Sequence, residues 1–308
     1  MGSHLIELAR RAARLPNLPV VVILALVFSI LGGLIGIIPL ALYFGTADVN
    51  QLSRIFGDAP SRTGFAWSLI LICSFGPFYL FIWAWLRLYE RRPFWTLGFE
   101  LPRWAAKYLR GVAAGLIFFS AAVAVMAACG YVAPEQGLEQ SQGRAAVGGV
   151  LAVLAGWVVQ GAAEEVVCRG WVLPVIGARY RAWLGVVVSS LVFTILHGLN
   201  PNLSAVALLN LFLVGLFLAL YALAEGGLWG VCAWHTAWNW AQGNLFGLEV
   251  SGMRTAGGML LNLVETGPDV VTGGAFGPEG GLAVTLVIGL GIGALLLFRG
   301  WAAKLVRA

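Results

Sequence analysis

The side chains best suited to chemistry lie inside apolar sequence. Glu164 and Glu165 are adjacent carboxylates, and Arg169 follows four residues after the second. Residues 147–159 before them and 171–177 after them carry no charge. Ionisable groups in such a setting are costly unless they are paired or line a wet cavity. This stretch is therefore the first candidate for a functional site.

Helical spacing separates the roles of the two carboxylates. Glu165 and Arg169 are four residues apart, so on a helix they share a face and can pair. Glu164 lies about 100° further round the same helix and points elsewhere. We therefore expect Arg169 to hold Glu165, while Glu164 stays free for other partners.

Two histidines and one amide complete the set of polar groups deep in apolar segments. His197 follows Phe193 by four residues, and Asn239 follows His235 by four, so each pair shares a helix face. Glu164 and His197 are both roughly 24 Å along their helices from a turn near Tyr180. We expect the carboxylate, the imidazoles and the amide to converge in a cavity open toward the cytoplasmic half of the bilayer.

This set of groups can support hydrolysis by an activated water. A carboxylate and imidazoles can bind and deprotonate water, while an imidazole and an amide can donate hydrogen bonds to an oxyanion. Two His and one Glu also suit catalytic zinc. Zinc, another divalent metal and no metal all remain open. No Ser-His-Asp or Cys-His set stands out, and Cys168 is interpreted as structural.

The same residues have other possible uses. An intramembrane Glu–Arg pair or histidine can simply join helices in a non-catalytic scaffold, and such groups can also form the proton or ion path of a transporter. From these residues alone, an enzyme, a transporter and a scaffold or immunity protein are all open.

The composition predicts an all-α, polytopic membrane protein. Of its 308 residues, 60% are hydrophobic and 11% are charged, whereas soluble chains carry about 25% charged residues. The mean hydropathy is +0.87. The formal charge of +5 does not indicate a nucleic-acid partner, because the basic residues cluster beside apolar segments.

About eight transmembrane helices are expected from segments near the length that crosses a bilayer. The predicted spans are residues 19–44, 64–88, 111–132, 146–176, 183–198, 203–224, 228–248 and 281–298. The basic and aromatic stretch 87–110 predicts a segment on the membrane surface. RNA binding is a weaker alternative for it, because no nucleic-acid module is visible.

The distribution of Lys and Arg predicts that both termini are cytoplasmic. Residues 1–18 form an N-terminal segment, of which 1–4 resemble a tag remnant, residues 19–299 form one membrane domain, and residues 300–308 form a tail. The Ala-, Gly- and Leu-rich composition suggests a bacterial inner membrane.

Three motifs in order resemble the signature of the CPBP family. They are Glu164-Glu165-x-x-x-Arg169, Phe193-x-x-x-His197 and His235-x-x-x-Asn239. This family comprises the type II CAAX prenyl endopeptidases and bacterial Abi-type relatives. The glycine-rich stretch 272–281 is also similar to bacterial members, and the resemblance covers residues 92–298.

The resemblance implies an intramembrane fold of eight helices with a four-helix catalytic core that hydrolyses peptide bonds. By resemblance, Glu164 would be the general base, and His197 would hold the water or a metal. His235 and Asn239 would stabilise the oxyanion.

The resemblance further implies that Glu165 and Arg169 orient the first motif. The partners it implies are the lipid bilayer and a membrane-associated peptide or protein, lipidated or anchored at its C-terminus. Because bacteria generally do not prenylate their own proteins, we expect a peptide precursor or the anchor of a surface protein.

Overall fold

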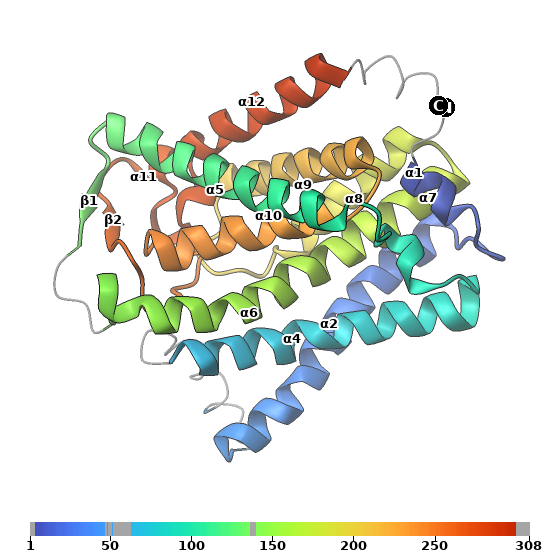
Figure 1. The fold of residues 1–308 in the computed structure, drawn as a ribbon, viewed down its shortest axis with the longest axis horizontal. Coiled ribbons are helices and arrows are strands. Elements are labelled where there is room, and N and C mark those ends of the chain that lie inside the picture. Colours follow the sequence, from blue (N-terminus) through green and yellow to red (C-terminus); the bar gives the residue numbers. More distant parts are fainter. Residues whose placement is uncertain (1–3, 47, 49–50, 52–62, 136–139, 300–308) are drawn as a thin grey trace.

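The computed structural model describes residues 4–46, 48, 51, 63–135 and 140–299. Most of the predicted tag remnant and the tail 300–308 therefore lie outside the described residues. The described chain is a bundle of helices with one small pair of strands (Figure 1).

The helices agree in order with the predicted spans. The longer helices are α2 (Leu18–Phe44), α4 (Gly64–Trp85), α5 (Trp104–Ala128), α6 (Val147–Glu165), α9 (Ala205–Glu225) and α12 (Leu282–Arg299). The shorter ones are α1 (His4–Ala9), α7 (Leu173–Arg179), α8 (Ala182–Leu196), α10 (Trp229–Trp240) and α11 (Asp269–Thr272). Single π-helical segments extend α4, α6 and α10 over Leu86–Glu90, Val166–Val172 and Ala241–Leu245.

The predicted class, an all-α polytopic membrane protein, is confirmed. Within the described residues, five helical segments are long and apolar enough to cross a membrane. They are Leu18–Phe44, Gly64–Glu90, Trp104–Ala128, Gly143–Arg179 and Ala205–Glu225. Two shorter apolar helices are Ala182–Leu196 and Leu282–Leu297. The seventh predicted span, 228–248, is α10 with its π-helical extension, Trp229–Leu245, and most side chains of α10 are buried in the bundle.

The stretch 87–110 does not form one surface segment as predicted. Its first residues continue α4 as a π-helix, and its last seven residues are the first two turns of α5. Between them, Arg92 is buried and its Nε donates to Glu90 Oε2 at 2.6 Å. Trp171 Nε1 donates to the other oxygen of Glu90, also at 2.6 Å. The buried ion pair thus ties this connection to the helix of the first motif.

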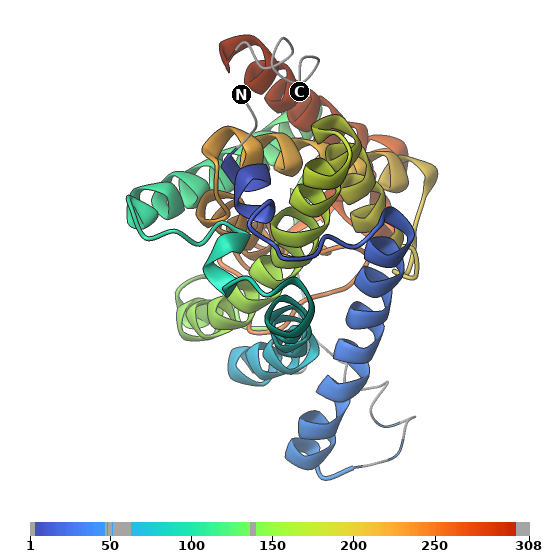
Figure 2. The same ribbon diagram turned by 90° about the vertical axis from the view of Figure 1, so that its right-hand side faces the viewer.

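The two ends of the bundle differ. α1 and α7 lie at one end, and β1 (Val132–Pro134), β2 (Leu263–Glu265) and α11 lie at the opposite end (Figure 1). β1 and β2 are antiparallel, with Val132 opposite Glu265. The C-terminal half of α2 leans away from the other helices (Figure 2), and its Leu42 is 80% exposed. This exposed apolar surface suits contact with lipid.

Glycines set how closely α10 approaches its neighbours. A Cβ on Gly111 of α5 would lie 2.2 Å from the carbonyl oxygen of Gly230, and one on Gly115 would lie 2.5 Å from that of Trp234. On α6, a Cβ on Gly161 would lie 2.9 Å from the backbone nitrogen of Thr236. Small residues at helix interfaces allow such backbone contact in membrane bundles. They fix the depth and rotation of α10.

We expect Gly161→Val to destabilise the fold by about 1–3 kcal/mol, the usual cost of overpacking. The added methyl groups would push α10 away from α6, which carries both glutamates. Thermal unfolding of the purified protein measures the effect. Gly148→Val on the same helix is the control, because nothing lies within 4 Å of a Cβ there. Equal melting temperatures for the two variants would contradict this account of the interface.

The strand pair contains a carboxyl group that responds to pH. Burial, followed by the nearby charge of Glu249, raises the pKa of Glu265 to about 7. The folded state therefore binds this proton more tightly than the unfolded chain does. The resulting stability is present at low pH and is lost as pH rises through about 7. We expect Glu265→Gln to raise the melting temperature at pH 8 by a few degrees and to change it little at pH 5. The same shift at both pH values would contradict this.

Candidate active site

The predicted pair of Glu165 and Arg169 is present and fully buried. Arg169 Nη1 donates to Glu165 Oε1 at 2.8 Å, and both side chains have no exposed surface. Arg169 Nη2 donates to the backbone oxygen of Gly215 on α9 at 3.1 Å. The guanidinium carbon lies 4.5 Å from the ring centroid of Phe193 on α8. One arginine therefore joins three helices behind the site.

A π-helical segment follows the two glutamates directly. It runs from Val166 to Val172, and all its residues are buried. Such segments are rare and occur often at functional sites. This segment was not predicted, because a π turn leaves no regular hydrophobic period in the sequence.

His235 is oriented by Glu165. Its Nδ1 lies 2.9 Å from Glu165 Oε1. Because an ionised carboxylate only accepts hydrogen bonds, Nδ1 carries the proton of this bond. The other ring nitrogen, Nε2, lies 3.7 Å from Glu164 Oε2. Glu165 thus holds both Arg169 and His235, and it turns the free side of the imidazole toward Glu164.

His197 approaches the same oxygen from another helix. It is the residue after α8, and its Nδ1 lies 2.8 Å from the backbone oxygen of Phe193. A carbonyl accepts, so Nδ1 donates here too. His197 Nε2 lies 3.8 Å from Glu164 Oε2. Both imidazoles therefore face Glu164 Oε2 from a distance too long for a direct hydrogen bond.

Gln160 links Asn239 to the opposite oxygen of Glu164. Its Nε2 donates to Glu164 Oε1 at 2.8 Å, and its Oε1 accepts from Asn239 Nδ2 at 2.9 Å. Gln160 is buried one helical turn before Glu164. Gln160 is not among the predicted site residues, although a lone amide on the same face of an apolar helix is a usable signal. Glu164 Oε2 has no hydrogen-bond partner among the described residues.

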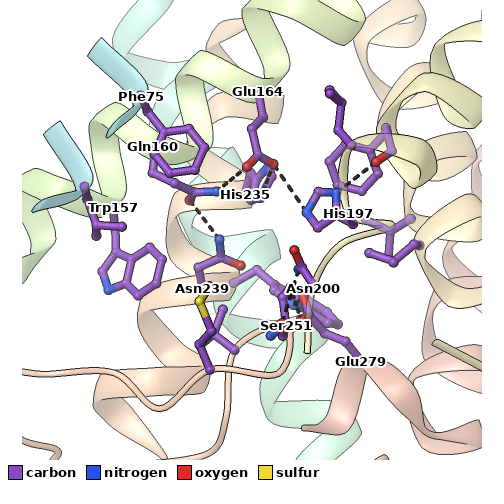
Figure 3. A pocket seen from close by; sticks show the side chains of 18 of the residues that line it. Phe75, Trp157, Gln160, Glu164, His197, Asn200, His235, Asn239, Ser251 and Glu279 are labelled. Carbon is purple, nitrogen blue, oxygen red and sulfur yellow. Dashed lines mark hydrogen bonds and ion pairs between the residues drawn. The ribbon is translucent and has the colours of Figure 1, made fainter. Parts of the chain in front are cut away.

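These groups open into one cavity of about 310 Å³ (Figure 3). Glu164, His197, His235 and Asn239 all line it. Glu165 and Arg169 do not, which separates the groups that can meet a ligand from those that support them. Most of the remaining wall is apolar and includes Trp67, Trp157, Trp234 and Trp238.

The cavity lies nearer to one end of the bundle than the sequence suggested. Asn200, Ser251 and Glu279 also line it, and they belong to the connections after α8, α10 and α11. The strand pair and α11 mark this end, opposite α1 and α7 (Figure 1). α8 ends at Leu196, so His197 lies at a helix end rather than within a span. The expected opening toward the cytoplasmic half of the bilayer stays a prediction.

The donor atoms do not form a ready metal site. Within the described residues, no group of three or more His, Cys, Asp and Glu side chains could hold a metal ion. The separations of 3.7 and 3.8 Å between Glu164 Oε2 and the two imidazole nitrogens suit a bridging water, which hydrogen-bonds at about 2.8 Å to each partner.

Comparison with known proteins identifies the segment that carries the site. The family described as type II CAAX prenyl endopeptidase Rce1-like matches residues 146–241. No curated protein and no solved structure matches the chain. The matched segment contains all six predicted site residues, from Glu164 to Asn239. The similarity to this family therefore covers the segment that carries all three motifs.

Proposed function

We propose that the protein is an intramembrane endopeptidase that cleaves a peptide bond with a water activated by Glu164. The observation that carries the proposal is Glu164 Oε2. It is buried, has no partner among the described residues, and lies 3.7 and 3.8 Å from two imidazole nitrogens, so one water beside these three atoms could bridge them. A buried carboxylate oxygen without a partner is costly unless water satisfies it. A water bound at Glu164 Oε2 would thus have a base beside it and would face a substrate in the cavity.

The first step is attack of this water on the carbonyl carbon. Glu164 accepts one proton as the oxygen–carbon bond forms, and the carbonyl electron pair moves to the oxygen. His197 Nε2 is free to accept a hydrogen bond and so orients the water. The new oxyanion needs donors. Asn239 has a second amide hydrogen besides the one given to Gln160.

His235 donates to the oxyanion as an imidazolium. Its Nδ1–H is bound to the Glu165 carboxylate, which stabilises a positive ring, and its Nε2–H then points into the cavity. In the second step the carbon–nitrogen bond breaks. Glu164 returns its proton to the leaving amine and is again a carboxylate, so the enzyme regains its starting protonation state. These steps use only groups of this chain, and we propose that they proceed without a metal ion.

The apolar wall favours a substrate that resides in or on the membrane. We propose a peptide precursor or an anchored protein that reaches the cavity from the lipid bilayer. The Lys and Arg distribution supports cytoplasmic termini in an inner membrane. In that orientation, the segment between α10 and α12 faces the opposite side of the membrane.

Co-expression with tagged, membrane-anchored candidate substrates tests the proposal. Wild type is expected to shorten at least one candidate, and Glu164→Ala and His197→Ala are expected to leave it intact. Purified wild type is expected to retain its activity after treatment with a chelator. Processing by either variant at the wild-type rate would refute the proposal, and loss of activity on chelation with recovery on adding zinc would refute its metal-free form.

A further inference from the structure

A strained turn forms part of the cavity wall. Residues 250 and 253 are joined by two backbone hydrogen bonds, from Val250 N to Met253 O at 2.9 Å and from Met253 N to Val250 O at 3.0 Å. The two residues between them are left-handed, with φ of +50° at Ser251 and +86° at Gly252. Such turns prefer Asn, Asp or Gly at both central positions. Ser251 therefore needs outside support.

Glu279 supplies this support. Its Oε2 accepts from Ser251 N at 2.9 Å and from Ser251 Oγ at 2.7 Å. Its Oε1 accepts from Trp238 Nε1 at 3.1 Å. Glu279 is only 9% exposed, so these bonds are largely shielded from water. One carboxylate thus connects the turn to α10, at the residue just before Asn239.

The turn is also joined to the segment that follows His197. Asn200 Nδ2 donates to the backbone oxygen of Ser251 at 3.2 Å. A Cβ on Gly252 would lie 2.2 Å from the backbone oxygen of Pro201, so this contact requires glycine. In space, the turn therefore lies between the segment after the second motif and the helix of the third motif. Figure 3 shows Ser251 beside Asn200 and Glu279.

The support on Glu279 is itself held in place. Asn210 of α9 is buried, and its Nδ2 donates to the backbone oxygens of Glu279 and Gly281, both at 2.8 Å. Thr285 Oγ1 of α12 donates to Asn210 Oδ1 at 2.6 Å. The position of the Glu279 carboxylate is thus fixed by two helices before it meets the turn.

We propose that Glu279 is a positioning residue that keeps Ser251 left-handed and so maintains the 250–253 turn as a wall of the substrate cavity. Three donors already occupy the Glu279 carboxylate, so Glu164, and not Glu279, is the group that transfers protons. The part of the proposal that concerns substrate rests on the proposed function. The part that concerns the turn does not.

Kinetics of Glu279→Gln test the effect on substrate. The glutamine side chain would place its NH₂ group, a donor, against either Trp238 Nε1 or the two donors of Ser251. At least one of the present hydrogen bonds would then be lost. We expect KM to rise about tenfold, equivalent to about 1.4 kcal/mol, with kcat within about twofold because Glu164 and both histidines are untouched. A fall in kcat at constant KM would overturn the proposal. Glu265→Gln is the matched control, assayed at pH 6, and should leave both constants unchanged.

A second substitution distinguishes support of the turn from direct contact with substrate. Glycine adopts positive φ without support, so adding Ser251→Gly to Glu279→Gln is expected to return KM to within about threefold of wild type. If Glu279 instead bound a cationic group of the substrate, glycine at 251 would restore nothing. Failure of this rescue would overturn the proposal.

Hydrogen exchange tests the turn without any substrate. The amide of Met253, bonded to Val250 O, is expected to exchange at least about tenfold faster in Glu279→Gln. Its protection should return in the double variant. Unchanged exchange in Glu279→Gln would overturn the proposal, even if the variant were inactive. Wild type that cleaves nothing would count against the proposed function, and exchange would still decide the role of Glu279.

Discussion

Replacing Glu164 with glutamine is expected to lower kcat by about 10³-fold, within the range usual for loss of a general base. Glutamine has nearly the same shape, but its amide cannot accept the proton that the attacking water must lose. Gln160 Nε2, now bonded to Glu164 Oε1 at 2.8 Å, can still donate to the amide oxygen of glutamine. Initial rates of reporter cleavage by purified protein in lipid measure the effect.

The same variant should fold normally. Its melting temperature is expected to remain within about 3 °C of wild type, because no buried charge loses a partner. Glu265→Gln serves as the control for a glutamine outside the cavity, and its kcat should not change. If Glu164→Gln keeps more than about a tenth of the wild-type kcat, Glu164 is not the general base.

Replacing Arg169 with methionine is expected to destabilise the protein by about 3–5 kcal/mol, the usual cost of breaking a buried pair. The Glu165 carboxylate would remain buried without its guanidinium, at 0% exposure. Gly215 O would also lose its donor. Little folded protein should survive extraction from the membrane, as size-exclusion chromatography and thermal unfolding would show.

A double variant isolates the cause of this loss. Glu165→Gln combined with Arg169→Met removes both charges, and replacing a whole buried pair is often neutral. We expect most of the stability to return. Activity should stay low, because His235 would lose the carboxylate that orients it through Nδ1. Equal stability of the single and double variants would contradict the buried-pair account.

Much of the site could be predicted because the membrane penalises unpaired polar groups. Glu165 and Arg169 had to meet because they share a helix face, and the structure pairs them at 2.8 Å. His197 and His235 had to find partners within the bundle, and both face Glu164. The helix order followed from the length of the apolar runs.

Other features depend on contacts that no local pattern encodes. The third motif lies on α10, which is buried because glycines on α5 and α6 let it sit inside the bundle. The length of the apolar run could not reveal that this helix is buried inside the bundle. Gln160 and Glu279 act through partners about 80 and 30 residues away, and their roles appear only once rotamers are fixed. The π turn after Glu165 likewise reflects tertiary packing.

The arrangement also separates binding from support in space. Groups that line the cavity can meet a ligand, whereas Glu165 and Arg169 lie behind it and hold His235 and three helices. Rigid support of this kind keeps reacting groups within the narrow geometry that catalysis requires. Variants behind the cavity should therefore lose stability first, and variants that line it should lose turnover first.

The mass of the cleavage products in water enriched with heavy oxygen tests the central claim most directly. Purified wild type in lipid is expected to add one heavy oxygen atom to the new carboxyl end of a membrane-anchored reporter, and Glu164→Gln is expected to release no fragment in the same period. A labelled fragment formed by Glu164→Gln at the wild-type rate would contradict water activation by Glu164.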